Sequence, residues 1–260
     1  MKTNRMKSLL AEGRPALGCS VMIPSPQVVE MLGHAGFDWV LIDMEHGSIG
    51  LESAELMVMA AEAAGLTPIV RPRSNAAAEI SAAMDRGAMG VQVPHVNSAA
   101  DASAAVAAVK FGPGAMRGLA AGTRPDSYGL GPAMPAFTGA ANAESLVCVQ
   151  LEHAAAIANA DEILAVEGVD VFFIGPSDLS QSMGHPGDPA APPVKAAIEA
   201  TLARIVAAGR VPGMPATAGN VEAVLAAGAR YVYTHLPKIL GLGAGAFLGK
   251  ARGQGRFGDP

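Results

Sequence analysis

Cysteine is scarce in this sequence. Cys19 and Cys148 are the only two among 260 residues, and both fall in short apolar runs that are predicted to be strands. A pair of cysteines in a chain of this size is more simply interpreted as two small buried hydrophobic side chains than as a disulfide framework. The scarcity fits a reducing cytoplasm, where we expect this protein to be located.

Long apolar runs and clustered positive charge are also missing. No uninterrupted apolar segment reaches the roughly 20 residues that a membrane-spanning helix needs, and the stretch MKTNRMKSLLAEGR lacks the apolar core of a signal peptide. The formal net charge is -5, and no basic run is interleaved with aromatic residues. We therefore expect a soluble, unprocessed protein whose partners include neither a membrane nor a nucleic acid.

Several signatures of catalysis are absent as well. The sequence has no dinucleotide fingerprint, no P-loop and no Gly-x-Ser-x-Gly elbow. The glycine pattern GLGAGAFLG near residue 241 follows the last predicted strand and has no βαβ unit after it. None of the lysines ends a core strand, so a Schiff-base mechanism has no evident nucleophile. Electron withdrawal from a substrate would have to come from a metal ion.

What the sequence does contain is a regular alternation of short β-type runs with alanine-rich helical segments. Eight strands are predicted, at residues 16–22, 38–43, 67–71, 89–93, 146–151, 170–174, 211–214 and 230–234. Crossover helices are expected between them, for example at residues 26–35, 52–64 and 76–86. Eight β-then-α units without a linker predict one closed (β/α)8 TIM barrel, of class α/β, over residues 1–260.

Two segments depart from this alternation. Residues 111–139 are rich in glycine and proline, carry Arg117 and Arg124, and are longer than a normal connection, so we expect them to cover a site or to touch another subunit. After the eighth strand, a glycine-rich apolar helix is expected at about residues 237–251. This helix is either the last helix of the barrel or one that packs on a neighbouring chain.

Polar side chains gather at the carboxyl ends of the predicted strands, which is where barrels of this type carry out their chemistry. In order along the chain they are Asp43, Glu45 and His46; Arg71 and Arg73; Gln92 and His95; Gln150, Glu152 and His153; and Ser177 and Asp178. They follow strands two to six, so the ionisable groups lie on one arc of the rim.

Two of these acids, Glu152 and Asp178, follow adjacent strands. Two carboxylates with few other ligands nearby suit a hard divalent cation such as Mg2+, Mn2+ or Co2+, which keeps open positions for water and substrate. The same residues also have a structural interpretation, in which Glu152 opens a helix and Asp178 caps the helix that begins at PSDL. Because the neighbouring strand ends are polar too, we favour a metal site.

His46 ends the motif DWVLIDMEHG. Because histidine titrates near neutral pH, His46 is a candidate general base that Asp43 or Glu45 would orient, although a surface histidine at a strand end gives the same pattern. Arg71 ends an otherwise apolar strand, where a guanidinium can bind a carboxylate or stabilise a developing oxyanion. Gln150 can supply a hydrogen bond to substrate or serve as a buried structural amide.

Five motifs carry a family resemblance. They are DWVLIDMEHG at 38–47, VRP at 70–72, VQVPHV at 91–96, VQLE at 149–152 and FFIGPSDLSQSMGHPG at 172–187. In this order, across residues 16 to about 245, they resemble the HpcH/HpaI aldolase family, the class II pyruvate aldolases typified by 4-hydroxy-2-oxoheptanedioate aldolase. The resemblance implies a barrel of the phosphoenolpyruvate/pyruvate-binding type with an extra C-terminal helix.

The resemblance also implies roles for the matched residues. Glu152 and Asp178 would bind the metal, His46 would be the general base, and Arg71 would bind pyruvate and stabilise its enolate. A further set would assist: Asp43 supporting His46 from behind or through water, Gln150 beside the metal, and the backbone at Ser177 and Asp178 receiving the pyruvate carboxylate.

By the same resemblance the protein would be a metal-dependent aldolase that reversibly cleaves 4-hydroxy-2-oxo acids to pyruvate and an aldehyde. Related enzymes act in aromatic or sugar-acid catabolism, and the family implies a hexamer, a trimer of dimers that exchange the helix at 237–251. Segments 111–139 and 214–220 carry the groups expected to meet the aldehyde, with Arg117 or Arg124 as possible carboxylate ligands. Two alternatives stay open: a citrate-lyase-β-like lyase acting on a CoA thioester, which predicts a basic groove, and a non-catalytic barrel that serves as a binding module.

Overall fold

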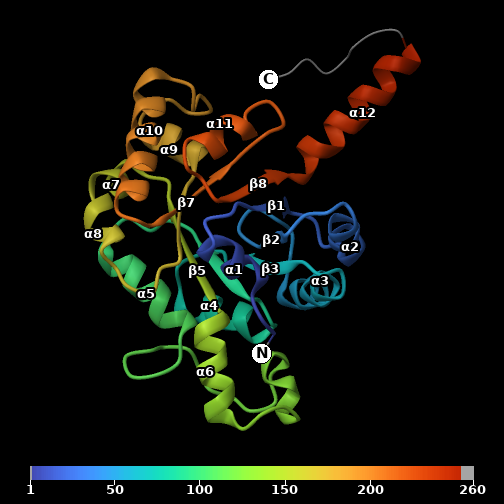
Figure 1. The fold of residues 1–260 in the computed structure, drawn as a ribbon, viewed down its shortest axis with the longest axis vertical. Helices are drawn as coiled ribbons and strands as arrows, with labels where there is room; N and C mark the ends of the chain where they lie inside the picture. Colours follow the sequence, from blue (N-terminus) through green and yellow to red (C-terminus); the bar gives the residue numbers. More distant parts are fainter. Residues whose placement is uncertain (1, 253–260) are drawn as a thin grey trace.

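The structure is a computed structural model that describes residues 2–252. Eight parallel strands close into a barrel in chain order, β1-β2-β3-β4-β5-β6-β7-β8 (Figure 1). The strands are β1 Ala16–Val21, β2 Trp39–Asp43, β3 Thr67–Arg71, β4 Gly90–Val93, β5 Leu146–Leu151, β6 Val171–Ile174, β7 Val211–Pro215 and β8 Tyr231–His235. The prediction of a (β/α)8 barrel is confirmed.

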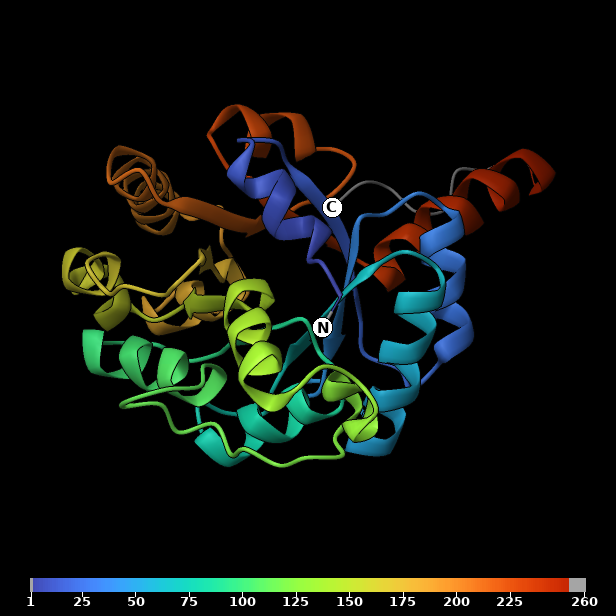
Figure 2. The same cartoon turned by 60° about the horizontal axis from the view of Figure 1, so that its bottom comes forward.

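Helices surround the barrel, as the view in Figure 2 shows. They are α1 Arg5–Ala11, α2 Pro26–His34, α3 Leu51–Ala63, α4 Ala77–Asp85, α5 Ala99–Val109, the 3-10 helix η1 Arg124–Gly129, α6 Met134–Glu144, α7 Ala154–Ala158, α8 Ala160–Leu164, α9 Pro176–Ser182, α10 Pro192–Ala207, α11 Val221–Ala226 and α12 Leu236–Arg252. Gly36 and Gly65, which follow α2 and α3, have φ values of 95° and 77°. This left-handed backbone is the conformation expected of a glycine helix cap.

The inside of the barrel is apolar near the amino ends of the strands. Alternate strand residues face inward there and form a buried cluster that includes Trp39, Ile69, Leu146 and Tyr231. Met6 of α1 belongs to the same cluster. Helix α1, which the mixed polar N-terminal sequence did not predict, therefore covers this end of the barrel.

Glycines on neighbouring strands make room for these large rings. A Cβ atom at Gly213 would lie 2.8 Å from the Phe173 ring, and one at Gly18 would overlap the indole of Trp39. The rings pack in turn on one another, with the centroids of Trp39 and Tyr231 4.1 Å apart. The absence of a side chain on Gly18 and Gly213 is therefore what allows the rings of Trp39, Phe173, Tyr231 and Tyr233 into one narrow barrel.

Further along the same strands, the inward-facing positions become polar. Ser20, Asp43, Arg71, Gln92, Gln150 and His235 occupy them, and the first five are buried. A second, larger apolar cluster fills the space between the outer faces of the strands and the helices. The polar groups are thus enclosed by apolar layers on every side except the carboxyl ends of the strands, where the site lies.

Residues 111–139 do not lie at that open end, so they do not cover the site of their own chain, which was one of the two roles expected of them. They connect the end of α5 to the start of β5, and therefore run along the amino-terminal side of the barrel, where η1 and part of α6 give them regular structure (Figure 1). Arg117 pairs with Asp85 and donates a hydrogen bond to the Val109 carbonyl. Arg124 pairs with Glu62. Both arginines hold this segment to the barrel, and neither is free to bind a substrate at the open end of its own chain.

The C-terminal helix α12 is longer than expected by a residue at each end and extends away from the barrel (Figures 1 and 2). None of its residues is buried, and it exposes Leu240, Leu242 and Phe247. Among the described residues, no helix combines the length and apolar character needed to cross a lipid bilayer.

Candidate active site

Strands β2 and β3 place a buried ion pair at the mouth of the barrel. Asp43 and Arg71 are register partners on adjacent strands. The Arg71 guanidinium donates from Nε to Asp43 Oδ1 at 3.0 Å and from Nη2 to Asp43 Oδ2 at 2.5 Å. Burial alone would lower the pKa of Arg71, but the hydrogen bonds and charge of Asp43 raise it above its ordinary value. The arginine is therefore a fixed positive charge whose plane is set by Asp43.

The turn after β2 holds the acids and the imidazole of the DMEHG motif. Asp43 Oδ1 accepts hydrogen bonds from the backbone N–H groups of Glu45 and His46, at 3.1 and 3.2 Å. The chain then passes so close to β1 that a Cβ at Gly47 would lie 2.7 Å from the Met22 carbonyl oxygen and overlap that of Asp43. Gly47 is therefore needed for this close approach of the turn to β1.

His46 itself is half-exposed, and its nearest acidic group is Glu45, with Nε2 and Oε2 3.7 Å apart. Asp43 contacts the backbone of His46 and the side chain of Arg71. Of the two acids considered as partners for this imidazole, Glu45 is the one whose carboxylate reaches it. Asp43 supports His46 by accepting a hydrogen bond from its backbone N–H, which fixes the conformation of the turn.

A chain of buried hydrogen bonds crosses the barrel to Glu152. The Tyr231 hydroxyl donates to Gln92 Oε1 at 3.1 Å, and Gln92 Nε2 donates to Gln150 Oε1 at 2.6 Å. Gln150 Nε2 then donates to Glu152 Oε2. Each amide is committed at both ends, so the chain fixes which side of Gln150 faces the carboxylate.

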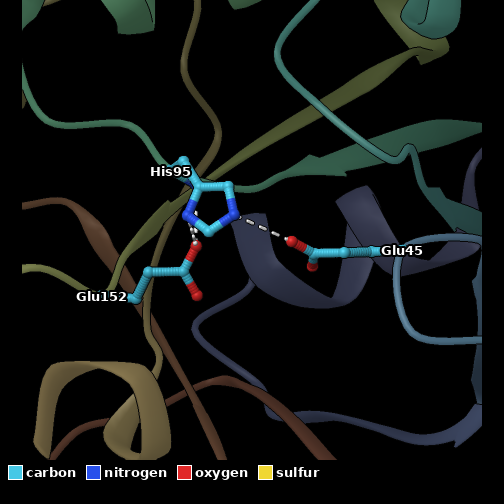
Figure 3. Close-up of side chains that lie close together, drawn as sticks. All are labelled: Glu45, His95 and Glu152. Atoms are coloured by element: carbon cyan, nitrogen blue, oxygen red, sulfur yellow. Dashed lines mark hydrogen bonds and ion pairs between the residues drawn. The ribbon is translucent and has the colours of Figure 1, made fainter. Parts of the chain in front are cut away.

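His95 lies between two carboxylates, as Figure 3 shows. Its Nδ1 is 3.1 Å from Glu152 Oε1 and its Nε2 is 3.1 Å from Glu45 Oε1. The backbone N–H of His95 donates to the same Glu152 oxygen at 2.7 Å. His95 has a φ of 57°, which is uncommon for a residue with a side chain and turns both its N–H and its ring toward Glu152.

The two carboxylates are poorly compensated. Glu45 Oε2 is buried without a hydrogen-bond partner, although Arg71 Nε lies 3.2 Å away. Burial raises the pKa of Glu152, against opposing effects of the hydrogen bonds from the His95 backbone and Gln150. Concentrated negative charge with an unused oxygen atom is the environment that a divalent cation relieves.

The donor set also fits such a cation. One ligand atom from each of Glu45, His95 and Glu152 lies within 4.8 Å of the others. Oxygen donors with a single imidazole nitrogen suit Mn2+ or Co2+, and the carboxylates alone suit Mg2+.

Helix α9 carries the remaining predicted residues, and Asp178 is not part of the group formed by Glu45, His95 and Glu152. It starts after Gly175, where a Cβ would lie 3.0 Å from Glu152 Oε2. Ser177 and Asp178 stand in the first turn of this helix, with Ser177 exposed and Asp178 partly buried. Asp178 is an acid of the first turn rather than the N-cap, which is Gly175.

Apart from Arg117 and Arg124, the predicted residues lie at the carboxyl end of the barrel, yet two members of the cluster, Glu45 and His95, were not predicted as metal ligands. The sequence indicates His95 only as a polar residue at a strand end, and Glu45 only as a group that orients His46. The position of His95 in VQVPHV was the available signal. Its contact with two acids depends on a left-handed turn that the sequence pattern does not predict.

The site can therefore do three things chemically. A fixed guanidinium is available to an anionic oxygen, because Asp43 uses only some of the five N–H donors of Arg71. Two carboxylates and an imidazole can hold a cation. A half-exposed imidazole, His46, is available to accept a proton.

Comparison with other proteins adds to this geometry. Residues 17–232 match the family described as HpcH/HpaI aldolase/citrate lyase. The chain is 40% identical over 210 residues to a hydroxypyruvate/pyruvate aldolase from Sagittula stellata, covering 81% of each chain. It is 37% identical over 212 residues to a 4-hydroxy-2-oxo-heptane-1,7-dioate aldolase from Shigella sonnei, covering 81% of this chain and 80% of the other.

A solved structure is similar over almost the whole chain. A HpcH/HpaI aldolase/citrate lyase family protein from Burkholderia cenocepacia superposes with a TM-score of 0.91 and 31% identity. The match covers 96% of this chain and 100% of that one. Fold and sequence therefore point to the same group of proteins.

Proposed function

The chain belongs to the HpcH/HpaI aldolase/citrate lyase family, and from that premise we propose that it is a metal-dependent aldolase that reversibly cleaves 4-hydroxy-2-oxo acids to pyruvate and an aldehyde. The observation that carries the proposal is the joint position of Arg71, the acidic cluster around Glu152 and the imidazole of His46 at one mouth. An aldol cleavage needs these three: an electrophile, an anion-binding group and a base.

Glu152 and Asp178 would hold the cation, with Glu45 and His95 as the adjoining donors. The unpartnered oxygen of Glu45 and the raised pKa of Glu152 support a cation at this place. When bound, the cation would polarise the 2-oxo group and stabilise negative charge on its oxygen. Gln150 would keep the Glu152 carboxylate in position through its hydrogen bond.

Arg71 would bind the oxygen on which charge develops. Its guanidinium is 5% exposed and bound edge-on by Asp43, so little reorganisation is needed when a substrate oxygen arrives. The N–H groups of the first turn of α9, at Ser177 and Asp178, would receive the substrate carboxylate, because the amino end of a helix favours anions.

His46 would act as the base. It would take the proton from the 4-hydroxyl group, the C3–C4 bond would break, and the electron pair of that bond would remain on the three-carbon fragment as an enolate. The C4 carbon would leave as the aldehyde, and a proton added at C3 would complete pyruvate. The half-exposed ring of His46 can reach both substrate and solvent, as a base that must return its proton requires.

The C-terminal helix would serve assembly. Helix α12 buries none of its residues in its own chain, although it carries Leu240, Leu242 and Phe247. A helix with such a face gains stability only against another surface. We propose that it packs on a partner subunit within a hexamer built as a trimer of dimers, the whole chain forming one domain in the cytoplasm.

The thioester-lyase alternative is less well supported. The relatives that are 37% and 40% identical to this chain are named as aldolases. The citrate lyase β subunit from M. tuberculosis, which is 15% identical with a TM-score of 0.57, shares the fold alone.

Pyruvate release tests the function. Racemic 4-hydroxy-2-oxo acids of several chain lengths would be supplied with Mn2+, and NADH oxidation by a coupled lactate dehydrogenase would report pyruvate. We expect release that excess EDTA stops and added Mn2+ restores. No release from any member of the series, or release that EDTA does not affect, would contradict the proposal.

A further inference from the structure

His235 ends β8 at the mouth of the barrel and has no role in the function proposed above. Tyr233 and Tyr231, two and four residues earlier on the same strand, belong to the cluster inside the barrel. Because side chains alternate along a strand, His235 faces the same interior. Its ring packs edge-on against Tyr233, with the ring centroids 5.3 Å apart and the planes at 87°. The imidazole therefore stands on the aromatic layer and faces the open end.

The polar atoms here lack partners. Nδ1 of His235 is buried and makes no hydrogen bond. Ser20, its register partner on β1, is also buried, and its Oγ has no hydrogen-bond partner either. Buried polar atoms in proteins are nearly always paired, so two of them at one register position indicate a place where an outside molecule supplies the missing bonds.

The place adjoins the residues assigned to catalysis. Strand β1 lies between β8 and β2, so His235 is two strands away from Asp43 and the turn that carries His46. Burial lowers the pKa of His235, and the nearby charges of Arg71, Lys238 and His46 lower it further, against the opposing charge of Asp43. The ring is therefore neutral at neutral pH, with one nitrogen that donates and one that accepts.

The direction of the substrate follows from the order of strands. The pyruvate half would lie toward Arg71 on β3 and Glu152 after β5, on one side of His46. Carbon C4, whose hydroxyl proton goes to His46, would then direct its substituent to the other side, toward β1 and β8. Pro215 of β7, the register partner of Tyr233, continues this wall.

Resting on the aldolase function proposed above, we propose that His235 is a specificity-determining residue that hydrogen-bonds a hydroxyl group on the aldehyde half of the substrate. The preferred aldehyde would be one with a hydroxyl on the carbon next to its carbonyl group. A hydroxyl both donates and accepts, so it satisfies a neutral imidazole in either tautomer, whereas a carboxylate only accepts. Two unpaired polar atoms would also penalise an aldehyde with a methyl group at the same position.

The test compares two aldehydes of equal size. Glycolaldehyde and propanal differ by a hydroxyl in place of a methyl, and each would be added to pyruvate in the presence of Mn2+. His235→Phe keeps an aromatic ring on Tyr233 and removes the nitrogen atoms. We expect the ratio of kcat/KM for glycolaldehyde to that for propanal to fall by about 5–10-fold, the value of one hydrogen bond.

Two further variants distinguish hydrogen bonding from packing. His235→Asn keeps a polar atom near the position of Nδ1 and should retain much of the preference for glycolaldehyde. Thr234→Val changes the neighbouring residue, whose side chain points to the other face of β8, and should leave the ratio unchanged. The thermal midpoint of each variant shows that it is folded.

Enolisation is measured separately, as exchange of the pyruvate methyl protons for deuterium, followed by 1H NMR without any aldehyde. We expect His235→Phe to exchange at the wild-type rate. If wild-type protein neither exchanges nor adds aldehyde, the aldolase proposal fails and this inference with it. If wild type does both, three results would overturn the role of His235 alone. The first is an unchanged ratio of kcat/KM for the two aldehydes in His235→Phe, and the second is a loss of deuterium exchange equal to the loss of aldehyde addition. The third is a loss of aldehyde addition that is largest with succinic semialdehyde, which carries a carboxylate.

Discussion

The barrel interior has a lower half, near the amino ends of the strands, and an upper half, near their carboxyl ends. Both halves are built by the same strands at the same alternate positions, yet they differ completely in chemistry. On β2 the lower position is Trp39 and the upper one Asp43; on β3 they are Ile69 and Arg71. Both halves are buried. The lower half is closed by α1 and packed with rings, and the upper half is a network of ion pairs and hydrogen bonds.

The contrast between the two halves shows where stability and function are separated. Apolar burial stabilises the lower half without a need for specific partners. In the upper half, each buried polar group depends on another, and the groups left over, such as Glu45 Oε2 and His235 Nδ1, lie at the open end. If this division is strict, substitutions in the lower half change the free energy of unfolding, and substitutions in the upper half change turnover.

The largest effect is expected from the upper half. His46→Ala should lower kcat for aldol cleavage by about 10²–10⁴-fold, because the base that accepts the 4-hydroxyl proton is gone. Its thermal midpoint should stay at the wild-type value, since the ring is half-exposed. Pyruvate release and a thermal melt measure the two quantities on the same sample.

His34→Ala, on the exposed end of α2, is the matched control and should leave both quantities unchanged. Near-normal turnover by His46→Ala would transfer the role of base to another group at the mouth, and His95→Ala would then be the variant to compare.

The lower half should respond in the opposite way. Trp39→Ala should cost about 3–5 kcal/mol of unfolding free energy, because it empties the centre of the aromatic layer. The Trp39 Nε1 atom makes no hydrogen bond, so the loss is one of packing alone. Urea unfolding at a fixed protein concentration measures it, with Trp39→Phe as the milder control. A loss of turnover per folded molecule at low temperature would break the division between the halves.

The pattern of strands and the location of the site were within reach of the sequence, because both follow from period-two burial and from the rule that strand ends carry the chemistry. DWVLID, for example, predicts both β2 and the exit of Asp43 at the mouth. Three features were beyond it. The apolar side chains of helix α1 are buried only because the closed barrel covers them. Arg117 and Arg124 pair with acids that are distant in the sequence. His95 reaches Glu152 through a backbone φ of 57°.

The metal site allows a finer test of the upper half. Glu152→Ala should abolish Mn2+ binding in calorimetric titration, since Glu152 belongs to either donor set. If the cation is held by Glu152 and Asp178, Asp178→Asn should weaken binding by about 10–100-fold or more and His95→Ala by less. The reverse order would assign the cation to Glu45, His95 and Glu152. Unchanged affinity in Glu152→Ala would contradict both assignments.

The smallest effect on stability is expected on the amino-terminal side of the barrel, which is mostly apolar but contains the ion pair between Glu62 and Arg124. Glu62, at the end of α3, accepts hydrogen bonds from Arg124 and Lys2. Burial would raise the pKa of Glu62, but the hydrogen bonds and charges of Arg124 and Lys2 outweigh it and lower that pKa from its ordinary value of 4.5. The pair therefore stabilises the fold above about pH 4.5, and this stabilisation is lost as the pH falls through the lower pKa of the folded state.

Glu62→Gln should consequently cost about 1 kcal/mol at pH 7, and the difference from wild type should shrink as the pH is lowered below 4.5. Glu167→Gln, at an exposed position, should show no such dependence. Turnover at pH 7 should be unaffected by Glu62→Gln, because the pair lies at the far end of the barrel from His46. A stability difference that grows on acidification would mean that burial, rather than Arg124, dominates the pKa of Glu62. The ion pair with Arg124 would then not stabilise the attachment of the connecting segment to the barrel.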